Sequence, residues 1–133
     1  MTLEQGKELS KQEIASAGRA LDDAELLASN ERVESAISRA YYAIFHAARA
    51  ALYANDSHPI THRGVKTEFG RLLVKPGVVE KEYNTILQEA RDQRQVADYE
   101  AGELDLLPSI ELARDIVAKA KKFIDRMSVL VEE

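Results

Sequence analysis

The feature that most constrains the fold is the segment from residue 31 to residue 53, which is apolar around most of a helical surface. One stripe recurs at the helical spacing of three and four residues and consists of Val33, Ile37, Tyr41, Ile44, Ala48 and Leu52. Alanines at positions 36, 40, 43, 47, 50 and 51 add small apolar faces beside this stripe. Such a helix must be covered on several sides. We therefore expect it at the centre of a helix bundle, where its alanines let neighbouring helices approach closely.

The rest of the chain has the same helical period, and no segment alternates apolar and polar residues as a half-buried strand would. Thr61 is the expected N-cap of a short third helix. The further predicted helices span residues 3–27, 62–75, 79–97 and a last segment from near Pro108 to about residue 129. Long helices joined by short loops favour antiparallel packing. The prediction is an all-α, antiparallel four- to five-helix bundle, with residues 1–133 forming a single domain.

Composition narrows the class of protein further. The chain of 133 residues has no Cys, which excludes disulfides and Cys-based metal sites. It has no apolar run of the roughly 20 residues that cross a bilayer, and its first residues are polar, so we expect a cytoplasmic protein without a membrane partner. The net charge of -5 is not typical of a protein that binds nucleic-acid backbone over its whole surface. RNA would have to meet a local basic cleft, which a dimer could build by joining two patches.

Three segments together carry a resemblance to a known family. The second helix contains the run from Ser38 to Arg49, with a Tyr-Tyr pair followed by His46. The segment 57–69 contains His-Arg-Gly-Val ahead of a Phe, and residues 94–99 read Arg-Gln-Val-Ala-Asp-Tyr. In this order the three segments resemble the HEPN superfamily, specifically its small stand-alone UPF0332-like proteins, over roughly residues 10–128.

The resemblance implies a bundle that forms homodimers and is often encoded beside a minimal nucleotidyltransferase, as toxin and antitoxin. Many HEPN proteins are metal-independent ribonucleases, whose motif is an Arg followed after four to six residues by a His on a late helix. The corresponding late segment here has Asp98 and Tyr99 and no His. Some partner enzymes in the superfamily transfer nucleotides onto HEPN tyrosines, which makes Tyr99 a candidate acceptor.

The first candidate site lies on one face of the second helix. Arg39, Tyr42, His46 and Arg49 follow at offsets of three, four and three, so Arg39 and His46 lie about two turns, roughly 10 Å, apart. In a ribonuclease, His can transfer protons near neutral pH and Arg can bind a phosphate with two hydrogen bonds. The alternative is a polar seam inside the bundle, in which His46 binds a carboxylate and Tyr42 fills a helix interface.

Two further clusters are candidate phosphate sites. Arg91, Arg94 and Asp98 share a face of the fourth helix, and the two arginines could bind phosphate while Asp98 orients one of them. The alternative is a surface Arg–Asp pair worth a few tenths of a kcal/mol. A third cluster opens the short third helix, where free N–H groups can bind anions, and consists of His62, Arg63 and Lys66. Its alternative is a solvated first turn.

The remaining patterns point to no cofactor and no metal. The three histidines have no metal-binding spacing. The aromatic residues of the second helix could stack on RNA bases, although core packing explains the same spacing; they are Tyr41, Tyr42, Phe45 and Tyr53.

The prediction is a toxin–antitoxin or nucleotidyltransferase-partnered protein that binds RNA or nucleotide at a dimer cleft. Its binding residues would be Tyr42, His62, Arg63, Arg91 and Tyr99. The alternative is an active metal-independent endoribonuclease, with a catalytic set drawn from both protomers that consists of Arg39, His46, Arg94 and Asp98.

Overall fold

The computed structural model describes residues 2–98 and 109–132, and these residues form helices and connecting turns without a strand. The elements are α1 (Leu3–Ser29), α2 (Val33–Ala54), α3 (His62–Phe69), a π-helical turn (Gly70–Val74), α4 (Lys81–Ala97) and α5 (Ile110–Glu132). The prediction of an all-α helix bundle is confirmed. None of the helices described is long and apolar enough to span a bilayer.

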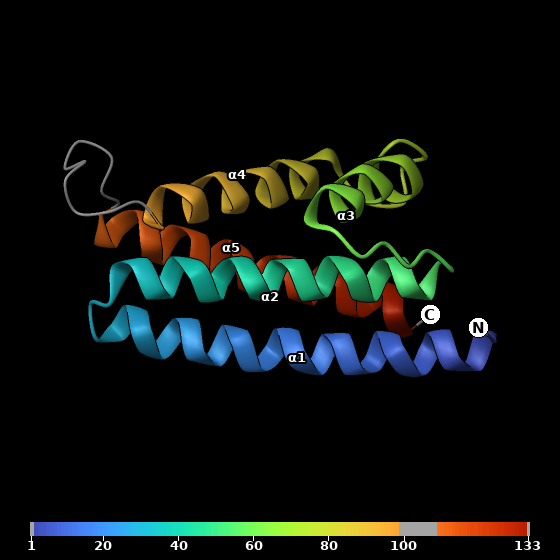
Figure 1. Ribbon diagram of the computed structural model, residues 1–133, viewed down its shortest axis with the longest axis horizontal. Helices are drawn as coiled ribbons and strands as arrows, with labels where there is room; N and C mark the ends of the chain where they lie inside the picture. The colour runs from blue at the N-terminus through green and yellow to red at the C-terminus, as the bar shows by residue number, and fades with distance from the viewer. Residues whose placement is uncertain (1, 99–108, 133) are drawn as a thin grey trace.

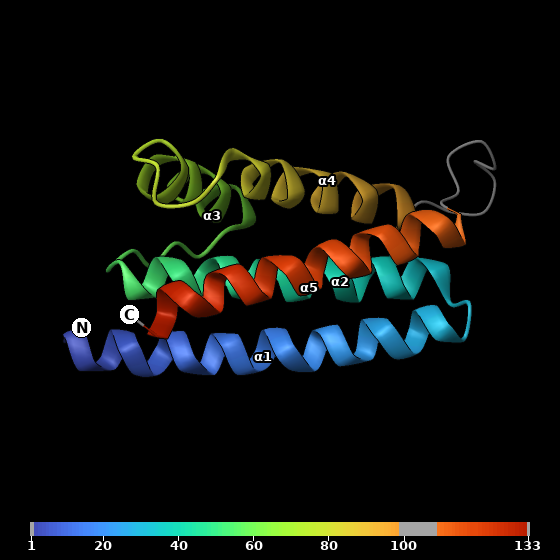
Figure 2. The same cartoon turned by 180° about the vertical axis from the view of Figure 1, so that it is seen from behind.

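The helices lie side by side as long rods with α2 between the others (Figure 1). Consecutive long helices run antiparallel: α1 against α2, and α4 against α5. From behind, α5 crosses α2 and lies between α1 and α4 (Figure 2). Because α2 and α5 are neighbours that run in the same direction, the bundle is not antiparallel at every contact. The short α3 covers the C-terminal half of α2 on the face away from α5.

The central position of α2 follows from its composition. Its fully buried alanines lie at positions 36, 40, 43, 47, 48, 50 and 51. Small side chains bring α1 close to α2, where the Ser10 hydroxyl donates a hydrogen bond to the Ala50 carbonyl at 2.9 Å. At the same contact, a Cβ on Gly6 would lie 3.3 Å from the Tyr53 carbonyl oxygen. The α1–α2 interface therefore has little spare room.

The segment after α2 turns back to place α3 against it. The Thr61 hydroxyl accepts a hydrogen bond from the Gly64 N–H at 2.9 Å, which confirms the predicted N-cap. The predicted helix 62–75 is wrong at its C-terminal end, where the Lys75 N–H binds the Gly70 carbonyl across five residues. Pro76 follows and cannot continue an α-helix, because it lacks an N–H and its ring clashes with the preceding turn.

The last helix begins slightly later than predicted. The Ser109 hydroxyl accepts a hydrogen bond from the Leu112 N–H at 3.1 Å, as an N-cap does, and the helix starts at Ile110. Pro108, near which this helix was predicted to begin, falls outside the described residues. On the bundle side, α5 buries a continuous stripe at helical spacing, made up of Ala113, Ile116, Val117, Ala120, Phe123, Ile124 and Met127.

Candidate functional site

The candidate site is a cavity of about 240 Å³ where α2, α3 and α4 meet. Its lining combines cations, an imidazole, a phenol and one carboxylate, from Tyr41, His62, Arg91, Arg94, Gln95 and Asp98. Arg94, Gln95 and Asp98 follow Arg91 by three, four and seven residues. The helical repeat alone therefore puts all four on one face of α4. α3 brings His62 to this face from a segment about thirty positions earlier in the chain.

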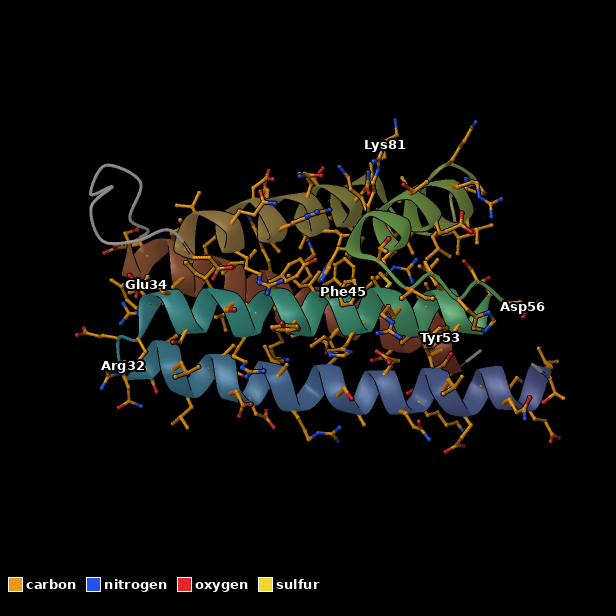
Figure 3. All side chains as sticks on the ribbon, viewed as in Figure 1. Arg32, Glu34, Phe45, Tyr53, Asp56 and Lys81 are labelled. Atoms are coloured by element: carbon orange, nitrogen blue, oxygen red, sulfur yellow. The ribbon has the colours of Figure 1, made fainter. Side chains whose placement is uncertain are left out.

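The floor of the cavity is formed by Tyr41 and His62. Tyr41 is 2% exposed, and its hydroxyl is hydrogen-bonded to the His62 Nδ1. The two rings stack with centroids 5.5 Å apart, and the Phe45 ring lies 4.4 Å from the imidazole. Figure 3 places Phe45 midway along α2, beneath α3. Contacts with these two aromatic rings therefore restrain the orientation of the His62 ring.

Burial favours the neutral form of both groups, and nearby arginines add to this effect at His62. Burial raises the pKa of the Tyr41 phenol, and Arg91 and Arg94 offset only part of that effect. The pKa of His62 is lowered, first by burial and then by the positive charges of Arg94, Arg91 and Arg49. The imidazole is thus unprotonated at neutral pH, because protonation would add a cation beside three guanidinium groups.

Arg94 lies against the two tyrosines of α2. Its guanidinium carbon is 5.2 Å from the centre of the Tyr41 ring and 4.8 Å from that of Tyr42, both within cation–π range. One Nη donates a hydrogen bond to the Tyr42 hydroxyl at 3.3 Å. The Nε is buried, stands 3.7 Å from the Asp98 carboxylate and has no hydrogen-bond partner among the residues that the structure describes. Arg94 is therefore held in place and retains hydrogen-bonding capacity.

The contact between Arg94 and Asp98 is an ion pair too long for a hydrogen bond. The Asp98 side chain is 62% exposed, so solvent screens the attraction, which is worth at most a few tenths of a kcal/mol. Asp98 caps α4 at its C-terminus, where the helix dipole disfavours a negative charge. With Arg91 alongside, the cavity holds two guanidinium groups against one carboxylate, in a chain whose net charge is -5. This is a local basic site in an acidic protein.

The predicted face of α2 divides into two environments. His46 Nδ1 is 2.6 Å from a Glu13 carboxylate oxygen on α1, and the Arg49 guanidinium is 3.8 Å from the other oxygen. Arg49 also donates a hydrogen bond to the Tyr53 hydroxyl. This carboxylate partner is the one that the polar-seam alternative expected for His46. We call these four residues, Glu13, His46, Arg49 and Tyr53, the α1–α2 seam.

Tyr42 connects the α1–α2 seam to the cavity. Its ring stacks on His46, with centroids 6.4 Å apart, and its hydroxyl accepts the hydrogen bond from Arg94. Arg39 is exposed, and its guanidinium carbon is 5.5 Å from the centre of the Tyr42 ring. Neither Arg39 nor His46 lines the cavity.

The structure therefore brings together His62, Arg91, Arg94 and Asp98 from the predicted residues. Arg63 is exposed and does not line the cavity, and Tyr99 falls outside the described residues. Sequence reasoning did not single out Gln95, although its position four residues after Arg91 gave a signal. It also missed Glu13, which no local pattern connects to His46. The described residues contain no three His, Asp or Glu side chains grouped as metal ligands.

Comparison with known proteins agrees with this fold. The family model for the HEPN domain matches residues 11–130. The chain belongs to the HEPN family. It is 38% identical to a UPF0332 protein of Thermotoga maritima over 117 residues, which cover 88% of this chain and 86% of that protein.

Two similar proteins of Methanocaldococcus jannaschii bear the name of candidate toxins. This HEPN chain is 35% identical to one over 113 residues, which cover 85% of the chain and 81% of that protein. It is 34% identical to the other over 101 residues, which cover 76% of this chain and 68% of that protein. The family resemblance of the three sequence segments is thereby confirmed.

Proposed function

We propose that this HEPN protein is a toxin-like protein that binds the phosphate backbone of RNA, or a nucleotide, at the cavity between α2, α3 and α4. The observation that carries the proposal is the pair of guanidinium groups, Arg91 and Arg94, beside the neutral imidazole of His62 in one cavity. The names of two relatives support the toxin-like role. The role of the pocket in binding rests on its chemistry.

A phosphodiester fits this cavity for two reasons. Arg is suited to phosphate because its planar guanidinium offers two parallel N–H donors. Arg94 is already oriented by Tyr41 and Tyr42, so binding would cost little side-chain entropy. The exposed Arg39 lies within cation–π range of the Tyr42 ring, which in turn contacts Arg94, and a flanking base could stack beside it.

We further propose that the protein acts as a homodimer whose two cavities face one groove. One cavity supplies only a small basic patch on an acidic surface, and joining two would double the charge offered to a polynucleotide. The proposed partner is a minimal nucleotidyltransferase that acts as antitoxin, as the family resemblance implies. Tyr99, which follows Asp98 in the sequence, is the proposed acceptor of a transferred nucleotide.

The binding experiment compares charge-removing variants inside and outside the cavity. Arg91→Gln and Arg94→Gln are titrated against labelled single-stranded RNA at several salt concentrations. Arg114→Gln is the matched control, because Arg114 is an exposed arginine on α5 and does not line the cavity. Loss of one guanidinium–phosphate contact should weaken binding. It should also make the slope of log binding constant against log salt concentration shallower by about one unit. Equal affinities for all three variants would exclude the cavity as the binding site.

A metal-independent ribonuclease is the second candidate function, favoured by the neutral imidazole that lines the same cavity as the two arginines. Of the predicted catalytic set, Arg94 and Asp98 lie in this cavity. Arg39 and His46 would then have to be contributed by the facing protomer of the proposed dimer.

A further inference from the structure

We propose that His62 and Tyr41 form the proton-transfer pair of an RNA-cleaving site in this cavity, with single-stranded RNA as the class of substrate. The inference deepens the proposed function and rests on it, since RNA must bind at Arg91 and Arg94 for the pair to act. The imidazole chemistry then belongs to the start of α3, where the sequence predicted only a candidate anion site.

The hydrogen-bond geometry determines which ring nitrogen carries the proton. Tyr41 is buried, and the described residues offer its hydroxyl one hydrogen-bond partner, the His62 Nδ1. A buried phenol that received a hydrogen bond from Nδ1 would leave its own proton unsatisfied, which costs about 1–3 kcal/mol. Tyr41 therefore donates to Nδ1, and the neutral imidazole carries its proton on Nε2.

The charges around His62 change when a phosphodiester binds. In the free protein burial lowers the pKa of His62 most, and the positive charges of Arg94 and Arg91 from α4 and Arg49 from α2 lower it further. A bound phosphate brings a negative charge next to the same arginines and offsets their field, which makes a transient imidazolium accessible. His62 can thus accept a proton after RNA binds, and it is unprotonated beforehand.

The chemical step is a transesterification in which the proton passes through the pair. The RNA 2′-hydroxyl gives its proton to the Tyr41 oxygen while the Tyr41 proton moves to His62 Nδ1. The 2′-oxygen forms a bond to phosphorus and the bond from phosphorus to the 5′-oxygen breaks. The imidazolium returns a proton from Nε2 to the leaving 5′-oxygen. The products are a 2′,3′-cyclic phosphate and a 5′-hydroxyl, and no proton is gained or lost overall. The imidazole is left with its proton on Nδ1, and exchange with solvent returns it to the starting Nε2–H form before the next turnover. Arg91 and Arg94 stabilise the charge on the phosphoryl oxygens.

The other histidines are less suited to this role. The Nδ1 of His46 is bound to the Glu13 carboxylate in the α1–α2 seam, outside the cavity. His58 stacks on the Tyr53 ring, with centroids 5.1 Å apart, and does not line the cavity either. His58 lies four residues before His62, so it provides a matched control for substitution of a histidine near the same turn.

The experiment incubates the purified protein with EDTA and a pool of labelled single-stranded RNAs that contain every dinucleotide step. The variants are His62→Gln, Tyr41→Phe and His58→Gln, and RNA affinity is measured in parallel. We expect wild type and His58→Gln to yield fragments ending in a 2′,3′-cyclic phosphate. His62→Gln and Tyr41→Phe should cleave about 100-fold more slowly or worse, a far larger change than in their affinity for RNA. Tyr41→Phe keeps the aromatic ring, so the loss would report on the hydroxyl.

Each contrary outcome has a distinct meaning. Wild-type protein that binds the RNAs without cleaving them would overturn the proton-transfer proposal and leave the binding function standing. Protein that binds no RNA would overturn both. Cleavage that survives in His62→Gln and disappears in His46→Gln would assign the reaction to the α1–α2 seam. In a cleaving wild type, kcat/KM reports the free protein, so it should fall at acidic pH with a midpoint below 6.5, because protonated His62 cannot accept the proton.

Discussion

Replacing Ala50 with Leu tests whether the α1–α2 interface is as close-packed as the structure shows. Ala50 is fully buried, and its carbonyl oxygen lies 2.9 Å from the Ser10 hydroxyl oxygen. One turn further along α2, the Tyr53 carbonyl oxygen would stand 3.3 Å from a Cβ placed on Gly6. A leucine at position 50 adds three carbons where the helix backbones leave no space for them.

Two packing models predict changes of opposite sign in the free energy of unfolding for this substitution. If the interface were loose, burying three more carbons would stabilise the fold by about 2.4 kcal/mol, at about 0.8 kcal/mol per methylene. In a close-packed interface, overpacking costs about 1–3 kcal/mol, because side chains leave their preferred rotamers or the helices move apart. We expect Ala50→Leu to lower the free energy of unfolding by about 1–3 kcal/mol. The values that the two models predict for this free energy therefore differ by at least about 3 kcal/mol.

The assay is urea unfolding followed by far-UV circular dichroism, at one protein concentration because dimerisation would make stability concentration-dependent. Ala15→Leu is the control, since Ala15 is an exposed residue of α1 and leucine is also a good helix former. The free energy of unfolding of the control should remain within about 0.5 kcal/mol of the wild-type value. An Ala50→Leu protein as stable as the control, or more stable, would refute the close-packed interface.

Two smaller predictions concern the start of α3. Thr61→Ala removes the hydroxyl that caps the Gly64 N–H, so it should destabilise the protein by about 1 kcal/mol and speed amide hydrogen exchange in residues 62–66; unchanged exchange would contradict the capping role. His62 has a lowered pKa, so between its folded pKa and its unfolded value near 6.5 the unfolded state binds more protons. The unfolding free energy should therefore fall as the pH drops through 6.5, and fall less in His62→Gln; an NMR titration with a His62 midpoint above 6.5 would contradict this.

The helical elements of this protein could be predicted from sequence because their causes are local. The apolar residues of α2 recur with a period that fits only a buried helix, and Thr61 lies where a helix N-terminus needs an acceptor. The end of α3 was predicted less well, since the period continues to Lys75 although the backbone widens at Gly70. A change from α to π bonding leaves no mark in the pattern of apolar residues.

The candidate site divides in the same way between local and distant causes. Arg91, Arg94 and Asp98 share a face because the helical repeat puts them there, whatever the rest of the chain does. Which histidine joins them depends on how α3 packs against α2. In the folded chain His62 lies in the cavity, and His46 lies against Glu13 on α1.

The sequence by itself determined that the chain forms helices and that α4 carries two arginines on one side. Only the tertiary structure decided that these arginines surround His62 and Tyr41. The physical reason is that helix periodicity acts within a few turns, whereas the packing of α3 against α2 joins residues 21 positions apart through a buried hydrogen bond. Spacing within the chain does not encode that contact.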